Sequence, residues 1–229
     1  MRFALDDEQV ALRDALDGLI AANDPVGVAR AAAAGDTGPA EALWKRLDDL
    51  GVNDLAAEAT PVEVVIAFEV LGRHAVPDAV GSTAGVRDDA ELATLATAAY
   101  LLGAGVRVLD DTVAYAKQRR QFGREIGSYQ AIKHHLADVR IALDFARPLV
   151  YGAALEPTPR SVSAAKVGAG DAAYLASRTG LQVHGAVGYT QELDLSIWLT
   201  AIRELQSAHG TAAFHRRRIL DSLLAERAR

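Results

Sequence analysis

The chain has 229 residues, enough for one large or two small domains with a substantial buried core. Half of the residues are hydrophobic but only 6% are aromatic, a balance that favours close-packed helices over a β-sandwich. The net charge of −6 argues against a general nucleic-acid binder, and the lack of cysteine excludes disulfides and Cys-ligated zinc.

The start of the sequence, MRFALDDEQ, has neither a basic segment nor an apolar core, so no signal peptide is predicted. No uncharged apolar run reaches the roughly 20 residues that a membrane span needs. We therefore expect a cytoplasmic protein without a nucleic-acid or membrane partner, and we predict no metal site.

The first 76 residues predict three clear helices. The first is capped by Asp6 and continues to about Asn23, where Asp24-Pro25 ends it. Residues 26–39 are rich in alanine and glycine, and they fit either a poor helix or a loop. Apolar spacing then predicts a helix around residues 43–50 and another from Pro61 to near Gly72.

Residues 77–90 predict a loop, because proline, glycine, serine and paired aspartates gather there. Apolar stripes follow over residues 92–113, 132–150, 162–183 and 198–205, with a continuation over 214–223. Such seams favour an antiparallel four-helix bundle. We predict an all-α protein with a small helical unit over residues 1–85 and the bundle over residues 86–229.

A polar turn joins the first two long helices and reads RRQFG, then IGSYQAI. From spacing alone, the simpler interpretation is that the arginines favour the helix dipole, Phe122 packs inward and Gly123 caps the helix. The alternative is a site for one small phosphate ligand, because Arg119, Arg120 and Arg124 form a local basic patch.

A second segment, QVHGAVGY, begins at Gln182. By themselves, the small residues Gly185 and Gly188 are typical of a flexible helix–helix turn. We interpret His184 as a packing residue.

Together these segments closely resemble the C-terminal domain of the FAD-dependent acyl-CoA dehydrogenase family. The resemblance implies that Arg119, Phe122, Gln130, Gln182, Gly185 and Gly188 hold the ADP part of FAD. The start of the chain, with FALDDEQ and LWKRLDDLG, resembles the family's N-terminal helices. The family's middle β-domain has no counterpart between residues 77 and 90.

A third segment, His209-Gly210-Thr211, resembles the place where the family carries its catalytic glutamate. Here a histidine replaces the glutamate. Because the family seats the isoalloxazine ring partly with its middle β-domain, which has no counterpart here, we interpret His209 as non-catalytic and predict no catalytic residue in this chain.

In the family, FAD lies at a subunit interface, and the neighbour's bundle holds its ADP part. The resemblance therefore implies an auxiliary subunit of a heteromeric (α2β2) acyl-CoA dehydrogenase that shares FAD with a full-length partner. The acyl-CoA, a fatty or steroid thioester, is then held mainly by that partner. Two alternatives stay open: flavin-independent, non-redox chemistry that uses His209, or a purely structural helical partner.

Overall fold

The structure is a computed structural model that describes residues 4–190 and 193–227. Within that part of the chain the fold is helical, and its β structure is a single two-stranded hairpin. The N-terminal helices are α1 (Asp7–Ala21), α2 (Pro25–Ala33), α3 (Gly38–Asp49), α4 (Leu55–Glu58), α5 (Pro61–Arg73), α6 (Ala79–Ser82) and α7 (Ala84–Asp88). The long helices α8 (Ala90–Gln118), α9 (Gln130–Leu155) and α10 (Pro159–His184) follow, then α11 (Leu195–Leu205) and α12 (Ala212–Arg227).

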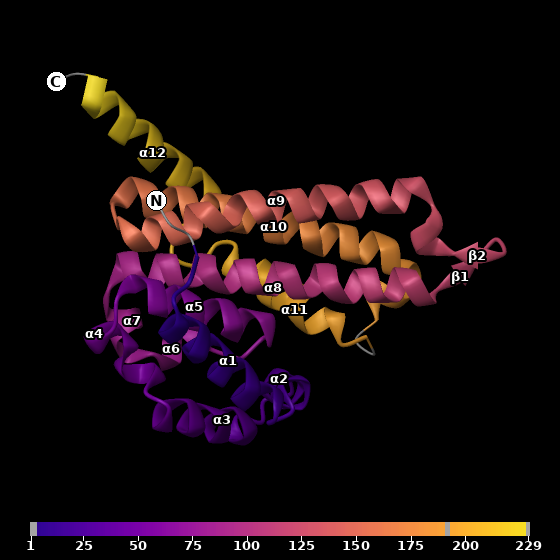
Figure 1. Cartoon of the computed structure of the whole chain (residues 1–229), viewed down its shortest axis with the longest axis horizontal. Helices are drawn as coiled ribbons and strands as arrows, with labels where there is room; N and C mark the ends of the chain where they lie inside the picture. The colour runs from indigo at the N-terminus through magenta and orange to yellow at the C-terminus, as the bar shows by residue number, and fades with distance from the viewer. Residues whose placement is uncertain (1–3, 191–192, 228–229) are drawn as a thin grey trace.

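The bundle is formed by α8, α9, α10 and α11, which lie side by side with α8 in the middle (Figure 1). The predicted all-α class and helical bundle are therefore confirmed. Helix α8 has the length and hydropathy of a membrane span, but 83% of its apolar window is buried inside the protein. It is the core helix of the bundle.

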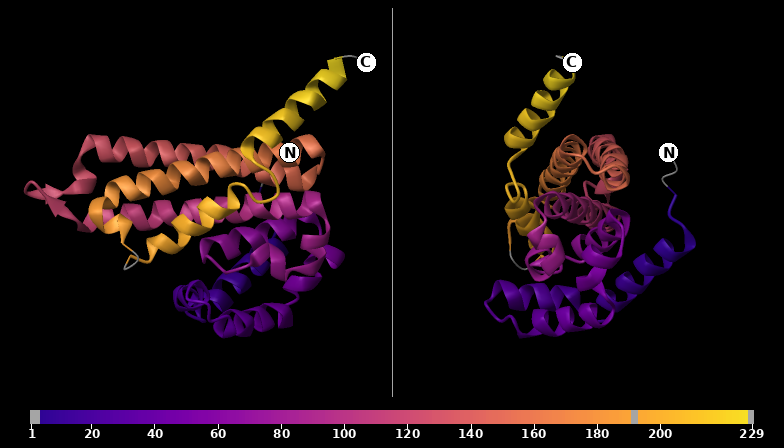
Figure 2. Two further views of the ribbon diagram at one scale, coloured as in Figure 1. Left: turned by 180° about the vertical axis from the view of Figure 1, so that it is seen from behind. Right: turned by 90° about the vertical axis from the view of Figure 1, so that its left-hand side faces the viewer.

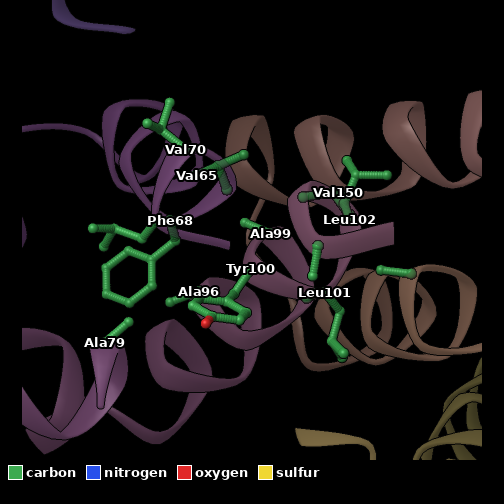
Figure 3. Close-up of a cluster of buried hydrophobic side chains, with 14 of the residues drawn as sticks. Val65, Phe68, Val70, Ala79, Ala96, Ala99, Tyr100, Leu101, Leu102 and Val150 are labelled. Atoms are coloured by element: carbon green, nitrogen blue, oxygen red, sulfur yellow. The ribbon is translucent and has the colours of Figure 1, made fainter. Parts of the chain in front are cut away.

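The N-terminal unit packs on the bundle mainly through α5, which lies along α8 with almost no space between the two backbones. A Cβ added at Gly103 would lie 1.9 Å from the carbonyl oxygen of Glu69. One added at Gly72 would lie 2.0 Å from the carbonyl oxygen of Tyr100. Figure 3 shows the buried side chains that this approach brings together, with Phe68 beside the residues of α8. The division near residue 85 stays a prediction.

Local signals explain where the N-terminal helices begin. Asp6 and Gln9 form a reciprocal capping box at α1, and Thr60 and Glu63 form another at α5. Residues 26–39, which fitted either a helix or a loop, contain α2, because Asp24 accepts a hydrogen bond at its first turn. The loop predicted for residues 77–90 is partly wrong, since the short helices α6 and α7 occupy most of it.

Helix α12 does not continue the bundle. Figure 2 shows it leaving the other helices at an angle. His215 is the buried residue of this helix, while Phe214, Leu220 and Leu224 are about half exposed. The chain therefore changes direction at residues 206–211, and the apolar residues after Gly210 do not continue the seam of the bundle as predicted.

Candidate functional site

The polar turn between α8 and α9 is a β-hairpin that extends beyond the end of the bundle (Figure 1). Strand β1 (Arg120–Gln121) pairs antiparallel with β2 (Arg124–Glu125). The two residues between them, Phe122 and Gly123, have φ values of 53° and 84°, as a type I′ turn requires. The ring of Phe122 is 92% exposed. The interpretation in which Phe122 packs inward and Gly123 caps a helix is therefore wrong.

The base of the hairpin is held by its own side chains. The Tyr129 hydroxyl donates to the carbonyl of Gln121 at 3.1 Å, and the Arg124 guanidinium lies 4.0 Å from the centroid of the Tyr129 ring. The backbone N–H of Ile126 donates to the carbonyl of Arg119 at 2.8 Å. These contacts fix the orientation of the tip.

Arg119 and Gln130 flank the hairpin with exposed side chains. Within residues 4–190 and 193–227, the Arg119 guanidinium has no acidic partner. Gln130 is the first residue of α9, whose N-cap makes no side-chain hydrogen bond to the helix. Residues 117–135 contain five Lys or Arg and one Glu, a net charge of +4 in a chain of net charge −6. This end of the bundle suits an anion.

The second predicted segment ends α10 at the same end of the bundle (Figure 1). Gln182 is exposed, whereas the His184 ring is buried and stacks on Tyr115 with centroids 4.2 Å apart. His184 also donates from Nδ1 to the carbonyl of Gly180 at 2.8 Å. The prediction that His184 is a packing residue is confirmed, and its stack fastens this segment to α8 four residues before Arg119.

Gly185 begins the turn η3 (Gly185–Tyr189) with φ 62° and ψ −138°, a conformation that glycine alone adopts easily. A Cβ at Gly185 would meet no atom within 4 Å, so its backbone faces open space. A Cβ at Gly188 would lie 3.2 Å from the Cβ of His184. The structure places all six predicted cofactor residues at one end of the bundle, and their role in binding stays a prediction.

His209 lies elsewhere, in the turn between α11 and α12. Its backbone has a φ of 56°, and its carbonyl accepts a hydrogen bond from Nε2 of the buried His215 at 3.0 Å. Nδ1 of His215 contacts the Ser163 hydroxyl at 3.1 Å. Burial and the nearby Lys166 lower the pKa of His209, which keeps its imidazole neutral at neutral pH.

Lys166 holds the other side of this turn. Its buried ammonium donates to the carbonyls of Leu205 and Gln206, at 3.0 and 3.1 Å, where α11 ends. Sequence reasoning missed both Lys166 and His215. The available signal was a lone lysine inside the alanine stripe of α10, next to Ala165.

The buried Lys166 predicts a pH dependence of stability. Desolvation lowers the pKa of Lys166 to about 8 from 10.5, so the unfolded chain binds more protons between these pH values, and stability rises with pH. Relative to a Lys166→Met variant, the wild type should gain up to about 3 kcal/mol of unfolding free energy across this window. Urea denaturation at several pH values measures this difference, and parallel curves would contradict it.

Residues 90–224 match the family described as "Acyl-CoA dehydrogenase, C-terminal domain". Acyl-CoA dehydrogenase IpdE2 of Mycobacterium tuberculosis is 40% identical over 123 residues, which cover 54% of this chain and 37% of that protein. The 3-sulfinopropanoyl-CoA desulfinase of Paraburkholderia xenovorans is 34% identical over 148 residues, covering 63% and 38% respectively.

Among solved structures, butyryl-CoA dehydrogenase from Megasphaera elsdenii is similar, with a TM-score of 0.58 and 28% identity. The match covers 62% of this chain and 38% of that one. The matched part is thus less than half of the length of each of these relatives. Because the family match covers more than half of this chain, the protein belongs to the acyl-CoA dehydrogenase family.

Proposed function

We propose that this chain is an auxiliary subunit of a heteromeric acyl-CoA dehydrogenase. In this proposal it holds the ADP part of an FAD whose isoalloxazine ring is seated by a full-length partner, in an α2β2 assembly. The partner then binds the acyl-CoA thioester and supplies the catalytic base. When bound, FAD supplies the hydride acceptor for α,β-dehydrogenation.

The exposed tip of the hairpin is the observation that carries the proposal. The Phe122 ring is 92% exposed and its backbone is left-handed, so this residue costs the isolated fold stability without adding to its core. A large aromatic ring held on a fixed hairpin is typical of an interface anchor. The tip extends away from the chain's own core (Figure 2), so it is accessible to a second chain.

The residues present fit the ADP part of FAD. The Arg119 guanidinium, which has no acidic partner in the part of the chain that the structure describes, suits the pyrophosphate, and the open backbone at Gly185 leaves room for a phosphate or ribose. The exposed amides of Gln130 and Gln182 can donate to and accept from adenine or ribose groups. The net charge of +4 over residues 117–135 favours the dinucleotide electrostatically.

Replacing Phe122 with glycine tests the interface role directly. The change removes the backbone strain of a non-glycine residue in the left-handed conformation, so the isolated chain should gain about 1 kcal/mol of unfolding free energy. Affinity for a full-length acyl-CoA dehydrogenase subunit from the same organism should fall about tenfold or more, because an anchoring aromatic is lost. Urea denaturation and size-exclusion co-elution measure the two effects. Unchanged partner affinity would count against the proposal.

The same proposal predicts that His209 is dispensable. In the purified complex, His209→Ala should leave the turnover of acyl-CoA within about twofold of the wild type, since no proton transfer depends on it. Dye-coupled dehydrogenation assays give the rate. A loss of several hundredfold would instead identify His209 as the base.

Non-redox chemistry is the second candidate, and one observation favours it. The relative from Paraburkholderia is named a desulfinase rather than a dehydrogenase. His209 carries a neutral imidazole, as a general base requires. Turnover of a CoA thioester by the flavin-free chain alone, abolished by His209→Ala, would establish this function.

A further inference from the structure

Helix α9 exposes an apolar stripe along the outer side of the bundle. Ile141, Phe145 and Leu149 are 53%, 73% and 44% exposed. They follow one another at intervals of four residues, so they lie on one face of the helix. In Figure 1, α9 is the edge of the bundle farthest from the N-terminal helices α1 to α3. The stripe is therefore open to another molecule.

The neighbouring helix α10 widens the stripe into a patch. Leu149 lies over Gly168, where an added Cβ would be 2.8 Å from the Cδ1 atom of the leucine. Leu175, seven residues further along α10, lies on the same side as Gly168 and is also exposed. Single exposed apolar side chains are common, but contiguous ones mark interaction sites. We define Ile141, Phe145, Leu149 and Leu175 as the α9 patch.

The face that carries the α9 patch is large enough for a specific interface. Helices α9 and α10 each have 26 residues, and they lie side by side. A helix of this length spans about 39 Å and is about 10 Å wide, so the two helices present about 800 Å². Stable protein interfaces bury about 800 Å² on each partner.

The stripe on α9 is self-complementary about Phe145. Ile141 and Leu149 lie four residues before it and four residues after it. If two α9 helices are antiparallel and related by a two-fold axis at Phe145, each Ile141 faces the Leu149 of the other copy. The two Phe145 rings then meet on the axis. Each exposed apolar side chain of the stripe is thus covered by another.

The charges at the ends of the stripe fit the same antiparallel arrangement. Lys133 and His134 lie near the N-terminal end of α9, and Glu156 follows its C-terminal end. In the part of the chain that the structure describes, none of these three side chains has an ion-pair partner. The antiparallel pair brings opposite charges together at both ends. It also places Asp138 opposite residues 149–155, which contain no acidic residue, whereas a parallel pair would place it against a second Asp138.

We propose that two copies of this chain pair through the α9 patch, with their α9 helices antiparallel and the two-fold axis at Phe145. The patch contains none of the six predicted cofactor residues and lies outside the hairpin, which the proposed function assigns to the full-length subunit. The pairing adds a contact to the proposed α2β2 assembly but does not rest on it, because it needs this chain alone.

Sedimentation equilibrium of the full chain without a partner tests the pairing. The wild type should be a dimer, and Phe145→Glu should raise the dissociation constant about a hundredfold or more, because two carboxylates then meet on the axis. Leu50→Glu, the same kind of change at an exposed leucine beside α3, should leave the dimer unchanged. A monomeric wild type, or a Phe145→Glu variant that dimerises equally well, would overturn this inference and leave the shared-flavin proposal standing.

Cysteine crosslinking tests the antiparallel register. The chain has no cysteine, so each introduced thiol is unique. Under oxidation by copper-phenanthroline, Phe145→Cys should form a disulfide-linked dimer, since its two Cα atoms meet near the axis. A mixture of Ile141→Cys and Leu149→Cys should crosslink between the two variants, while either variant alone should crosslink poorly. Ile141→Cys that links to itself as efficiently as the mixture would show a parallel pair and refute the proposal.

Discussion

Replacing Arg119 with alanine is expected to empty the flavin site that we propose this chain shares with a partner. Among the described residues, no acidic side chain pairs with this guanidinium at the end of α8, so its charge is available to the proposed pyrophosphate. Losing a charge-assisted contact of this kind costs about 2 kcal/mol, or roughly thirtyfold in the dissociation constant of FAD from the complex. Flavin absorbance per mole of purified complex gives the content directly.

Two further variants make the Arg119 result specific. Arg119→Lys keeps the charge but loses the planar fork, so its flavin content should be intermediate. Arg217→Ala removes an exposed arginine paired with Asp221 on α12, far from the hairpin, and should match the wild type. Wild-type flavin content in Arg119→Ala would favour the purely structural alternative.

Adding a single methyl group at Gly103 is expected to destabilise the chain more than the loss of most side chains would. The new Cβ would lie 1.9 Å from the Glu69 carbonyl oxygen, which is backbone and cannot rotate away. Helices α5 and α8 would have to separate, costing about 3 kcal/mol. This exceeds the gain of up to about 1 kcal/mol that alanine gives over glycine in a helix.

Gly152→Ala in α9 is the matched control for Gly103→Ala. Both glycines lie inside long helices, but a Cβ at Gly152 would meet no atom within 4 Å. The control should therefore be stabilised by about 0.5–1 kcal/mol through helix propensity alone. Urea denaturation of both variants measures the difference. Equal stabilities would show that α5 and α8 do not pack as closely as described.

Much of the fold could be predicted from local patterns. The cap at Asp6, the proline at position 61 and the apolar stripes from residue 92 onward each depend on neighbours within one or two turns of helix. The close approach of α5 and α8 could not be predicted. Gly72 on α5 leaves room for the backbone of α8, and Gly103 on α8 leaves room for the backbone of α5. This role can be recognised only when the positions of both helices are known.

In the candidate site, too, some features could be predicted from the sequence and others could not. The residues of the predicted cradle were found by their motif, but nothing in the motif shows that Phe122 adopts a left-handed conformation with an exposed ring. The anchoring of the His209 turn by Lys166 and His215 joins residues that lie far apart in the sequence. The change of direction at α12 is likewise set by that turn rather than by apolar spacing.

The visible absorption spectrum is the most direct test of the shared-flavin account. The chain should be purified alone and after co-expression with a full-length acyl-CoA dehydrogenase subunit from the same organism. The account predicts a colourless chain alone and a yellow complex in which both chains co-elute with bound flavin. Yellow protein from this chain alone, or a flavin-loaded partner that never binds this chain, would contradict it.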